Sequence, residues 1–227
     1  MPFPDLAENL AEVRGRIADA ARRGAGQQVT LVAVTKTHGP EAVRAVHALG
    51  VRDVGENKVQ EALPKMDAAA VPVRWHLIGH LQRNKSKAVE RFALVHSIDS
   101  VRLAEAVSKV GTTIGRRIPV LVQVNVSGEE TKGGFSPTEL AAGVDELAAL
   151  EGLEVRGVMT MAPFDAEERT LRAVFGGARG TLDTLQRAGL REARELSMGM
   201  SGDYEIAVEE GATIVRLGTV LFGARGT

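Results

Sequence analysis

The residue with the clearest potential chemistry is a lysine at the end of an apolar run. Val29 and residues 31–34 predict a strand buried on both faces, and Lys36 closes it. Alternation along the strand places Lys36 on the face of Val32 and Val34, so its amine would leave a dry interior at the strand's C-terminal end. Burial disfavours the charged ammonium, and the neutral amine is the form that attacks a carbonyl. The alternative is a lysine that extends from the strand end into water.

A second group of residues, near the C-terminal end of the sequence, could hold a phosphate. Ser201 precedes a short predicted helix, whose first N–H groups favour an anion. Gly218 and Thr219 lie in the next predicted strand and would let the backbone approach a ligand closely. Together they predict a phosphate site formed by the last two strand ends, as in many barrels. The alternative is that Gly202 belongs to a simple turn and Gly218 to a kink in the strand.

Arg216 shares the strand face of Gly218, two residues later, and that face is the interior one if the phosphate site is correct. A buried guanidinium cannot release its proton and needs an acceptor. A ligand that carries an aldehyde, a phosphate and a ring nitrogen would serve Lys36, the phosphate site and Arg216 at once. The alternative is a structural ion pair between Arg216 and one of three carboxylates, those of Asp99, Glu56 and Asp203.

The elements that must position these residues alternate between strands and helices. Residues 5–23 predict an amphipathic helix that begins after Asp5 and ends near Gly24. Eight strands are predicted, separated by helical segments, at 29–36, 51–55, 74–79, 93–98, 119–126, 153–160, 195–199 and 214–223. This rhythm is typical of a parallel sheet, and eight units predict a (β/α)8 TIM barrel. Because only four residues follow the last predicted strand, we expect the N-terminal helix to cover it.

An open, doubly wound sheet is the alternative architecture, but no glycine-rich dinucleotide motif follows the first strand. We expect residues 1–227 to form a single domain, because no linker or repeat interrupts the chain. Twenty-eight Lys and Arg residues against 29 Asp and Glu residues give a net charge of -1, which argues against nucleic-acid or membrane partners. The absence of cysteine fits a reducing compartment, and no signal peptide is visible, so we expect a cytoplasmic protein.

Seven separated motifs, in one order, carry a resemblance to a known family. They are LVAVTK (31–36), VGENKVQE (54–61), WHLIGHLQRNK (75–85), HSIDS (96–100), QVNVSGEETKGGF (123–135), GVMTMAP (157–163) and LSMGMSGDYEIAVEEGATIVRLGTVLFG (196–223). On these motifs the chain resembles the pyridoxal phosphate homeostasis proteins, which are similar to the N-terminal barrel of alanine racemase. The resemblance covers nearly the whole chain and implies pyridoxal 5'-phosphate (PLP) as the cofactor.

The resemblance implies a role for each matching position. Lys36 stands where the family's Schiff-base lysine stands, and Arg216 matches the arginine that faces the pyridine nitrogen. Asn57 matches a residue that lines the cofactor pocket. The phosphate-binding positions are matched by Ser201, Gly218 and Thr219. Glu56, His80, Met198, Gly199 and Met200 are expected to shape the pocket wall.

The expected function is therefore a PLP-binding protein of vitamin B6 and amino-acid homeostasis, without a confirmed reaction. An arginine beside the ring nitrogen keeps that nitrogen unprotonated and weakens carbanion chemistry. Racemisation also needs a second acid or base, and the only tyrosine, Tyr204, lies on the phosphate side. The alternatives are a PLP-dependent amino-acid racemase or lyase, and a class I aldolase in which Lys36 reacts with a phosphosugar. We expect a monomer that meets PLP-dependent apoenzymes transiently.

Overall fold

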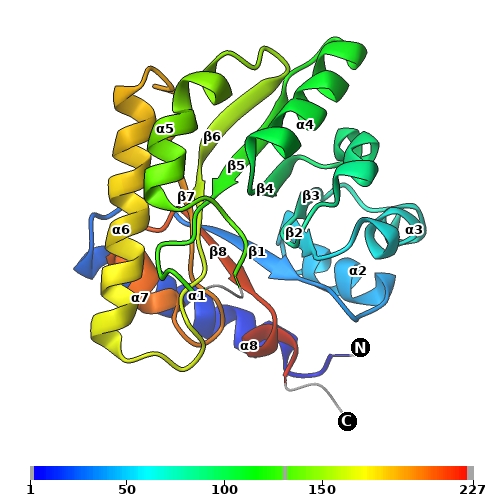
Figure 1. Ribbon diagram of the computed structural model, residues 1–227. Helices are drawn as coiled ribbons and strands as arrows, with labels where there is room; N and C mark the ends of the chain where they lie inside the picture. The colour runs from blue at the N-terminus through cyan, green and yellow to red at the C-terminus, as the bar shows by residue number, and fades with distance from the viewer. Residues whose placement is uncertain (1–2, 130–131, 224–227) are drawn as a thin grey trace.

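The strands close into a parallel barrel. The computed structural model describes residues 3–129 and 132–223, and its eight strands pair in chain order, with β8 beside β1 (Figure 1). The strands are β1 (Thr30–Val34), β2 (Asp53–Glu56), β3 (Arg74–Leu77), β4 (Leu94–Ile98), β5 (Ile118–Gln123), β6 (Leu153–Met159), β7 (Glu195–Ser197) and β8 (Ile214–Leu217). The predicted (β/α)8 TIM barrel is confirmed, and the polar residues that follow the strands gather at one end of it.

Helical segments connect the strands and cover the outside of the barrel. They are α1 (Leu6–Arg23), α2 (Pro40–Ala48), α3 (Val59–Ala69), η1 (Arg83–Arg91), α4 (Val101–Ile114), α5 (Pro137–Ala148), α6 (Glu168–Arg187), α7 (Tyr204–Glu209) and α8 (Thr219–Phe222). The segment η1 is a 3-10 helix. Across the described ranges, no helix combines the length and the apolar character needed to cross a membrane.

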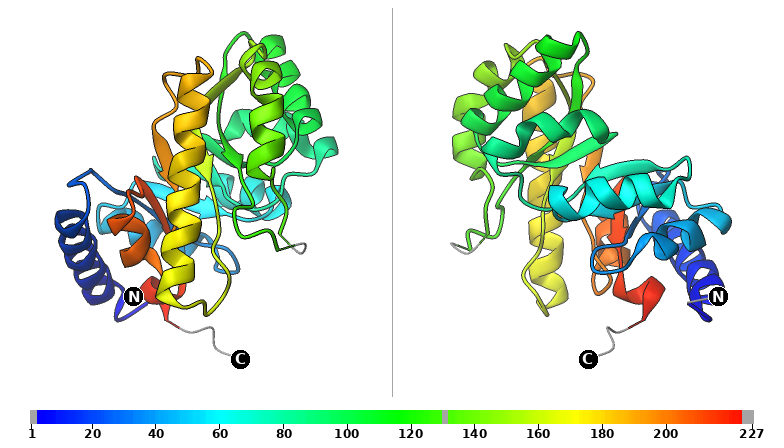
Figure 2. Two further views of the ribbon diagram at one scale, coloured as in Figure 1. Left: turned by 60° about the vertical axis from the view of Figure 1, so that its left-hand side comes forward. Right: turned by 90° about the vertical axis from the view of Figure 1, so that its right-hand side faces the viewer.

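The end of the last predicted strand was wrong. β8 stops at Leu217, and Gly218, with φ -124° and ψ -78°, turns the chain into the short helix α8. A helix does therefore follow β8. The N-terminal helix α1 nevertheless lies beside α7 and α8, as Figure 2 shows in both views. The Asn9 side chain fixes this contact by donating to the carbonyl of Leu221 at 3.0 Å.

Two apolar clusters fill the molecule. The larger one lies between the barrel and its helices and includes the buried face of α1. The smaller one fills part of the barrel interior and consists of Val32, Leu94, Leu121, Met159 and Ile214. Because side chains alternate along each strand, the inward positions two residues away belong to the same interior. Several of those positions are polar, so apolar packing fills only part of the barrel.

Candidate functional site

Lys36 lies in the turn after β1, two residues beyond Val34. The next residue, Thr37, has φ 69°, a left-handed conformation that turns the chain sharply toward α2. Val32, on the same strand, belongs to the interior cluster, and Lys36 follows at the C-terminal end of that strand. The predicted end of this strand at Lys36 was wrong, because β1 ends at Val34, and Lys36 is half-buried in the turn that follows. Its amine can therefore be reached from the C-terminal mouth of the barrel.

A buried ion pair holds the turn that presents Lys36. Lys65 of α3 donates to the Glu56 carboxylate at 2.7 Å and to the carbonyl of Thr35 at 2.8 Å. The Thr35 hydroxyl donates to the same Glu56 oxygen at 2.6 Å. Glu56 is fully buried between β2 and α3, so its expected place in the pocket wall was wrong. Its role is to anchor the backbone immediately before Lys36.

The loops after β7 and β8 meet, as the predicted phosphate site requires. The backbone N–H of Val220 donates to the Ser201 hydroxyl oxygen at 3.3 Å. The loop before α7 is closed on itself, because Asp203 accepts a hydrogen bond from the N–H of Met200 at 2.6 Å. Burial raises the pKa of Asp203. The hydrogen bond from the backbone N–H of Met200 and the positive charge of Arg216 oppose that shift. Ser201 is thereby fixed next to the start of α8.

This contact leaves several backbone donors without a protein partner. Within the part of the chain that the structure describes, the N–H groups of Ser201, Gly202, Gly218 and Thr219 donate to no protein acceptor. Ser201 and Gly218 are half-buried, whereas Gly202 and Thr219 are exposed. Clustered N–H donors with a hydroxyl group form an anion-binding concavity. The arrangement therefore fits a phosphate group.

Arg216 occupies the barrel interior next to this site and is 5 % exposed. Its guanidinium donates to the Ser197 hydroxyl oxygen at 2.6 Å and to the carbonyl of Thr160 at 3.0 Å. Burial lowers the pKa of Arg216 to about 10, which still leaves it charged at neutral pH, and Asp203 opposes that shift through space. A guanidinium has five N–H groups, so three have no acceptor among the residues that the structure describes.

The ion pair considered as the alternative for Arg216 was wrong, because each of the three carboxylates has another partner. Glu56 is paired with Lys65, and Asp203 accepts from the backbone of Met200. Asp99 lies 3.1 Å from His80, which is exposed at the rim. Arg216 is thus a buried charge whose protein partners are neutral acceptors.

Asn57 follows β2 directly and is half-buried at the same end of the barrel as Lys36. The loop after β3 packs closely against Asn57. A Cβ atom at Gly79, in that loop, would lie only 2.3 Å from the Asn57 carbonyl oxygen. On the other side of β1, the His38 and Phe222 rings stack with centroids 4.8 Å apart and join the Lys36 turn to α8. The ends of β8, β1 and β2, with Thr219, Lys36 and Asn57, are therefore neighbours.

Comparison with known proteins connects this geometry to a family. Residues 8–226 match the family described as "Alanine racemase, N-terminal domain". The chain is 43% identical to the pyridoxal phosphate homeostasis protein of Pseudomonas aeruginosa, over 97% of this chain and 96% of the relative. It is 41% identical to the protein of that name from Aquifex aeolicus, over 97% and 99%. The chain belongs to the family of pyridoxal phosphate homeostasis proteins.

A solved member of the family agrees with the fold and carries the cofactor. PipY of Synechococcus elongatus with PLP bound is 38% identical, covers 96% of this chain over its own full length (100%), and superimposes with a TM-score of 0.85. The family resemblance stated from the motifs is thereby confirmed. The donors present here also fit such a ligand, because an amine, a cluster of N–H groups and a guanidinium lie around one mouth.

Sequence reasoning missed two histidines inside the barrel. His76 and His96 lie within β3 and β4, are 4% and 0% exposed, and contact each other at 2.9 Å. Both sit in apolar strand patterns, Trp75-His76-Leu77 and Val95-His96. A histidine in the middle of a buried strand needs hydrogen-bond partners, and that requirement was the available signal. The strand pattern alone does not say which residues supply the partners.

Proposed function

We propose that this protein binds PLP at the C-terminal mouth of the barrel. Lys36 would supply the amine for the aldehyde, and Ser201 with the N–H groups of Gly218 and Thr219 would hold the phosphate. Arg216 would face the ring nitrogen, and Asn57 would line the pocket. The observation that carries the proposal is a gathering of N–H donors at this mouth, beside a buried guanidinium. Among the described residues, these donors and three N–H groups of the guanidinium have no acceptor.

PLP, when bound, supplies an aldehyde that joins an amine and a ring that withdraws electrons from it. The residues of this chain limit that chemistry. Arg216 only donates hydrogen bonds and stays charged, so a ring nitrogen facing it accepts a hydrogen bond and takes up no proton. Tyr204 is 2% exposed and packs its ring against Arg16 of α1, 5.8 Å from the guanidinium carbon. It is directed toward the outer layer, away from the barrel interior.

These features favour a carrier over a racemase or lyase. The proposed role is to hold PLP in the cytoplasm and to release it to PLP-dependent apoenzymes during transient encounters, with the protein acting as a monomer. The relatives' name, pyridoxal phosphate homeostasis protein, supports this role. A slow amino-acid racemase or lyase stays the competing function, and a class I aldolase the more distant one.

The decisive experiment is to locate the lysine that carries the cofactor. Purified protein is mixed with PLP, reduced with borohydride, digested and examined by mass spectrometry. We expect the pyridoxyl group on the peptide containing Lys36, and its loss in Lys36→Ala. Lys58→Ala is the matched control, because Lys58 is an exposed lysine paired with Glu61 at 2.9 Å. A label on another lysine would refute the site, and trapping only with a sugar phosphate would favour the aldolase.

A second experiment separates the carrier from the enzyme. Amino acids are incubated with the PLP-loaded protein in deuterated water, and exchange of the Cα hydrogen is followed by NMR. A carrier is expected to exchange it no faster than free PLP does. Exchange many times faster, lost in Lys36→Ala, would make the protein a PLP enzyme.

A further inference from the structure

A line of buried polar side chains crosses the barrel from Arg216 to its opposite end. Arg216 contacts Ser197 at 2.6 Å, Ser197 contacts His96 Nδ1 at 2.9 Å, and His96 Nε2 contacts His76 Nδ1 at 2.9 Å. His76 Nε2 contacts Asp53 at 2.9 Å, and Arg74 donates to both Asp53 oxygens at 2.6 and 2.5 Å. These six residues come from five strands, β8, β7, β4, β3 and β2, with His76 and Arg74 both in β3.

The chemistry of the two ends gives the hydrogen bonds one direction. A guanidinium only donates, so Ser197 accepts from Arg216. The carboxylate of Asp53 only accepts, because hydrogen bonds from His76 and Arg74 outweigh burial and lower its pKa to about 2. His76 therefore carries a proton on Nε2 and, when neutral, accepts from His96 on Nδ1. His96 in turn accepts the Ser197 hydroxyl proton on its own Nδ1.

A charged His76 would break this order. Its Nδ1 would then donate to His96, and His96 would donate to Ser197. The Ser197 oxygen would accept from both His96 and Arg216, which leaves its own hydrogen without an acceptor among the described contacts. Since Ser197 is fully buried, an unpaired hydroxyl there is costly. Only two neutral imidazoles, both protonated on Nε2, satisfy every group in the line.

We propose that His96, His76 and Asp53 are positioning residues that act through Ser197 to fix Arg216 in one orientation. Each hydrogen bond in the line polarises the next, so the negative charge of Asp53 stabilises a guanidinium that has no carboxylate beside it. The free N–H groups of Arg216 are then held in a constant direction. The role toward the ring nitrogen rests on the proposed PLP function, whereas the order of the hydrogen bonds does not.

The order is tested by 15N NMR of the wild-type protein labelled at histidine. The sequence contains five histidines, so the signals can be assigned with single substitutions. We expect His76 and His96 to be neutral at pH 7 and protonated on Nε2, with or without PLP. A proton on Nδ1 of His96, or a charged His76, would overturn the proposal. This result does not depend on PLP binding, so it is distinct from a failure of the proposed function.

The positioning role is tested by a double-substitution cycle read by PLP titration. Ser197→Ala and His96→Leu are each expected to raise the dissociation constant of PLP about tenfold. The double variant should be no weaker than Ser197→Ala alone, because both changes break the same line. Effects that multiply to about a hundredfold would refute the role. His47→Gln, on α2, is the matched control and should bind PLP as the wild type does.

Discussion

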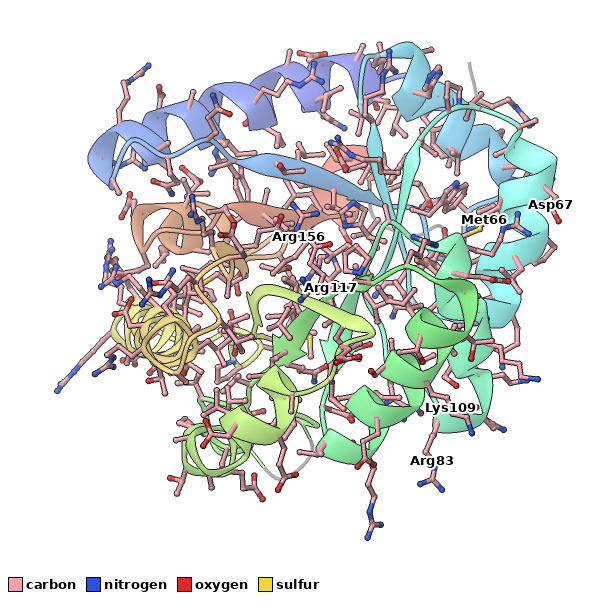
Figure 3. All side chains as sticks on the ribbon, turned by 90° about the horizontal axis from the view of Figure 1, so that it is seen from above. Met66, Asp67, Arg83, Lys109, Arg117 and Arg156 are labelled. Atoms are coloured by element: carbon pink, nitrogen blue, oxygen red, sulfur yellow. The ribbon has the colours of Figure 1, made fainter. Side chains whose placement is uncertain are left out.

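The two mouths of the barrel are both rich in charged and polar residues, yet they use them differently. At the N-terminal mouth, several arginines have acceptors within the protein. Arg74 forms an ion pair with Asp53, and Arg156 forms one with Glu195 at 2.6 Å. Arg117 donates to the carbonyl of Leu153 at 2.7 Å. Arg117 and Arg156 lie near the centre of the barrel seen from this end (Figure 3). At the C-terminal mouth, the donors at Ser201 and Thr219 have no protein acceptor among the described residues.

This comparison indicates that a binding site is marked less by charged groups as such than by polar groups that lack a hydrogen-bond partner within the protein. Two clefts of about 490 and 710 Å³ lie at the N-terminal mouth, and the arginines that line them include Arg74 and Arg156. Arg74 and Arg156 are already paired with carboxylates within the protein. The N–H donors of the C-terminal mouth have no acceptor among the described residues, so a ligand can supply one. Substitutions at the N-terminal mouth should therefore change mainly stability, and those at the C-terminal mouth mainly affinity. Asp53 should affect both, because the line of polar residues connects it to Arg216.

The largest effect is expected at the N-terminal mouth. Asp53→Ala removes the acceptor of Arg74 and leaves the buried Nε2–H of His76 unpaired. We expect the free energy of unfolding to fall by about 3 kcal/mol, measured by urea denaturation. Asp67→Ala is the control, because its ion pair with Arg91 at 2.7 Å is exposed and should contribute at most about 1 kcal/mol. Equal losses in both variants would contradict the importance of the buried contacts.

The opposite result, a loss of PLP affinity with little loss of stability, is expected for Ser201→Ala at the C-terminal mouth. The hydroxyl would contact a charged phosphate, and such hydrogen bonds contribute about 1.5–3 kcal/mol. The dissociation constant of PLP should rise about 10- to 100-fold in an absorbance titration, with little change in unfolding free energy. The control is Ser136→Ala, since Ser136 caps α5 through the N–H of Glu139 at 3.1 Å. That variant should lose about 1 kcal/mol of stability and bind PLP normally.

The line of polar residues that joins the two mouths should make stability depend on pH. Burial, helped by the positive charge of Arg216, lowers the pKa of His96 well below 6.5. Below pH 6.5 the unfolded chain takes up a proton at His96 and the folded protein does not, so stability falls as pH falls. The slope from this residue is at most about 1.4 kcal/mol per pH unit.

Asp53 adds a second, more acidic step, since its contribution is present above pH 3.8 and is lost as pH falls through about 2. Urea denaturation at pH 7, 6 and 5 separates the contribution of His96 from that of Asp53, because of these two residues only His96 affects stability in this range. The slope should be shallower in His96→Leu and unchanged in His47→Gln. Identical slopes in the wild type and His96→Leu would show that His96 is not held neutral.

The contrast between the mouths also explains how far the sequence could be interpreted. Strand rhythm predicts the barrel, and motif order predicts the family, because both are local patterns. The position of Lys36 after β1 and the meeting of Ser201 with the start of α8 followed from strand ends. The partner of Glu56 could not be foreseen, since Lys65 lies one helix away and either face of β2 was open to it. The His96–Ser197 contact likewise depends on barrel closure, because β4 and β7 are not neighbours in the sheet.

The smallest effect is expected for His80. This residue allows a group with a protein partner to be compared with the unpaired N–H donors of the same C-terminal mouth. His80 is polar and lies at the rim, but it has a partner, Asp99, at 3.1 Å, and its side chain is 69% exposed. By the rule that paired groups do not bind ligand, His80→Ala should change the PLP dissociation constant less than twofold and the unfolding free energy by under about 1 kcal/mol. A tenfold loss of affinity would show that a paired group can still serve the site. In that case, the presence of a partner within the protein would not distinguish structural groups from ligand-binding groups, even for an exposed residue such as His80.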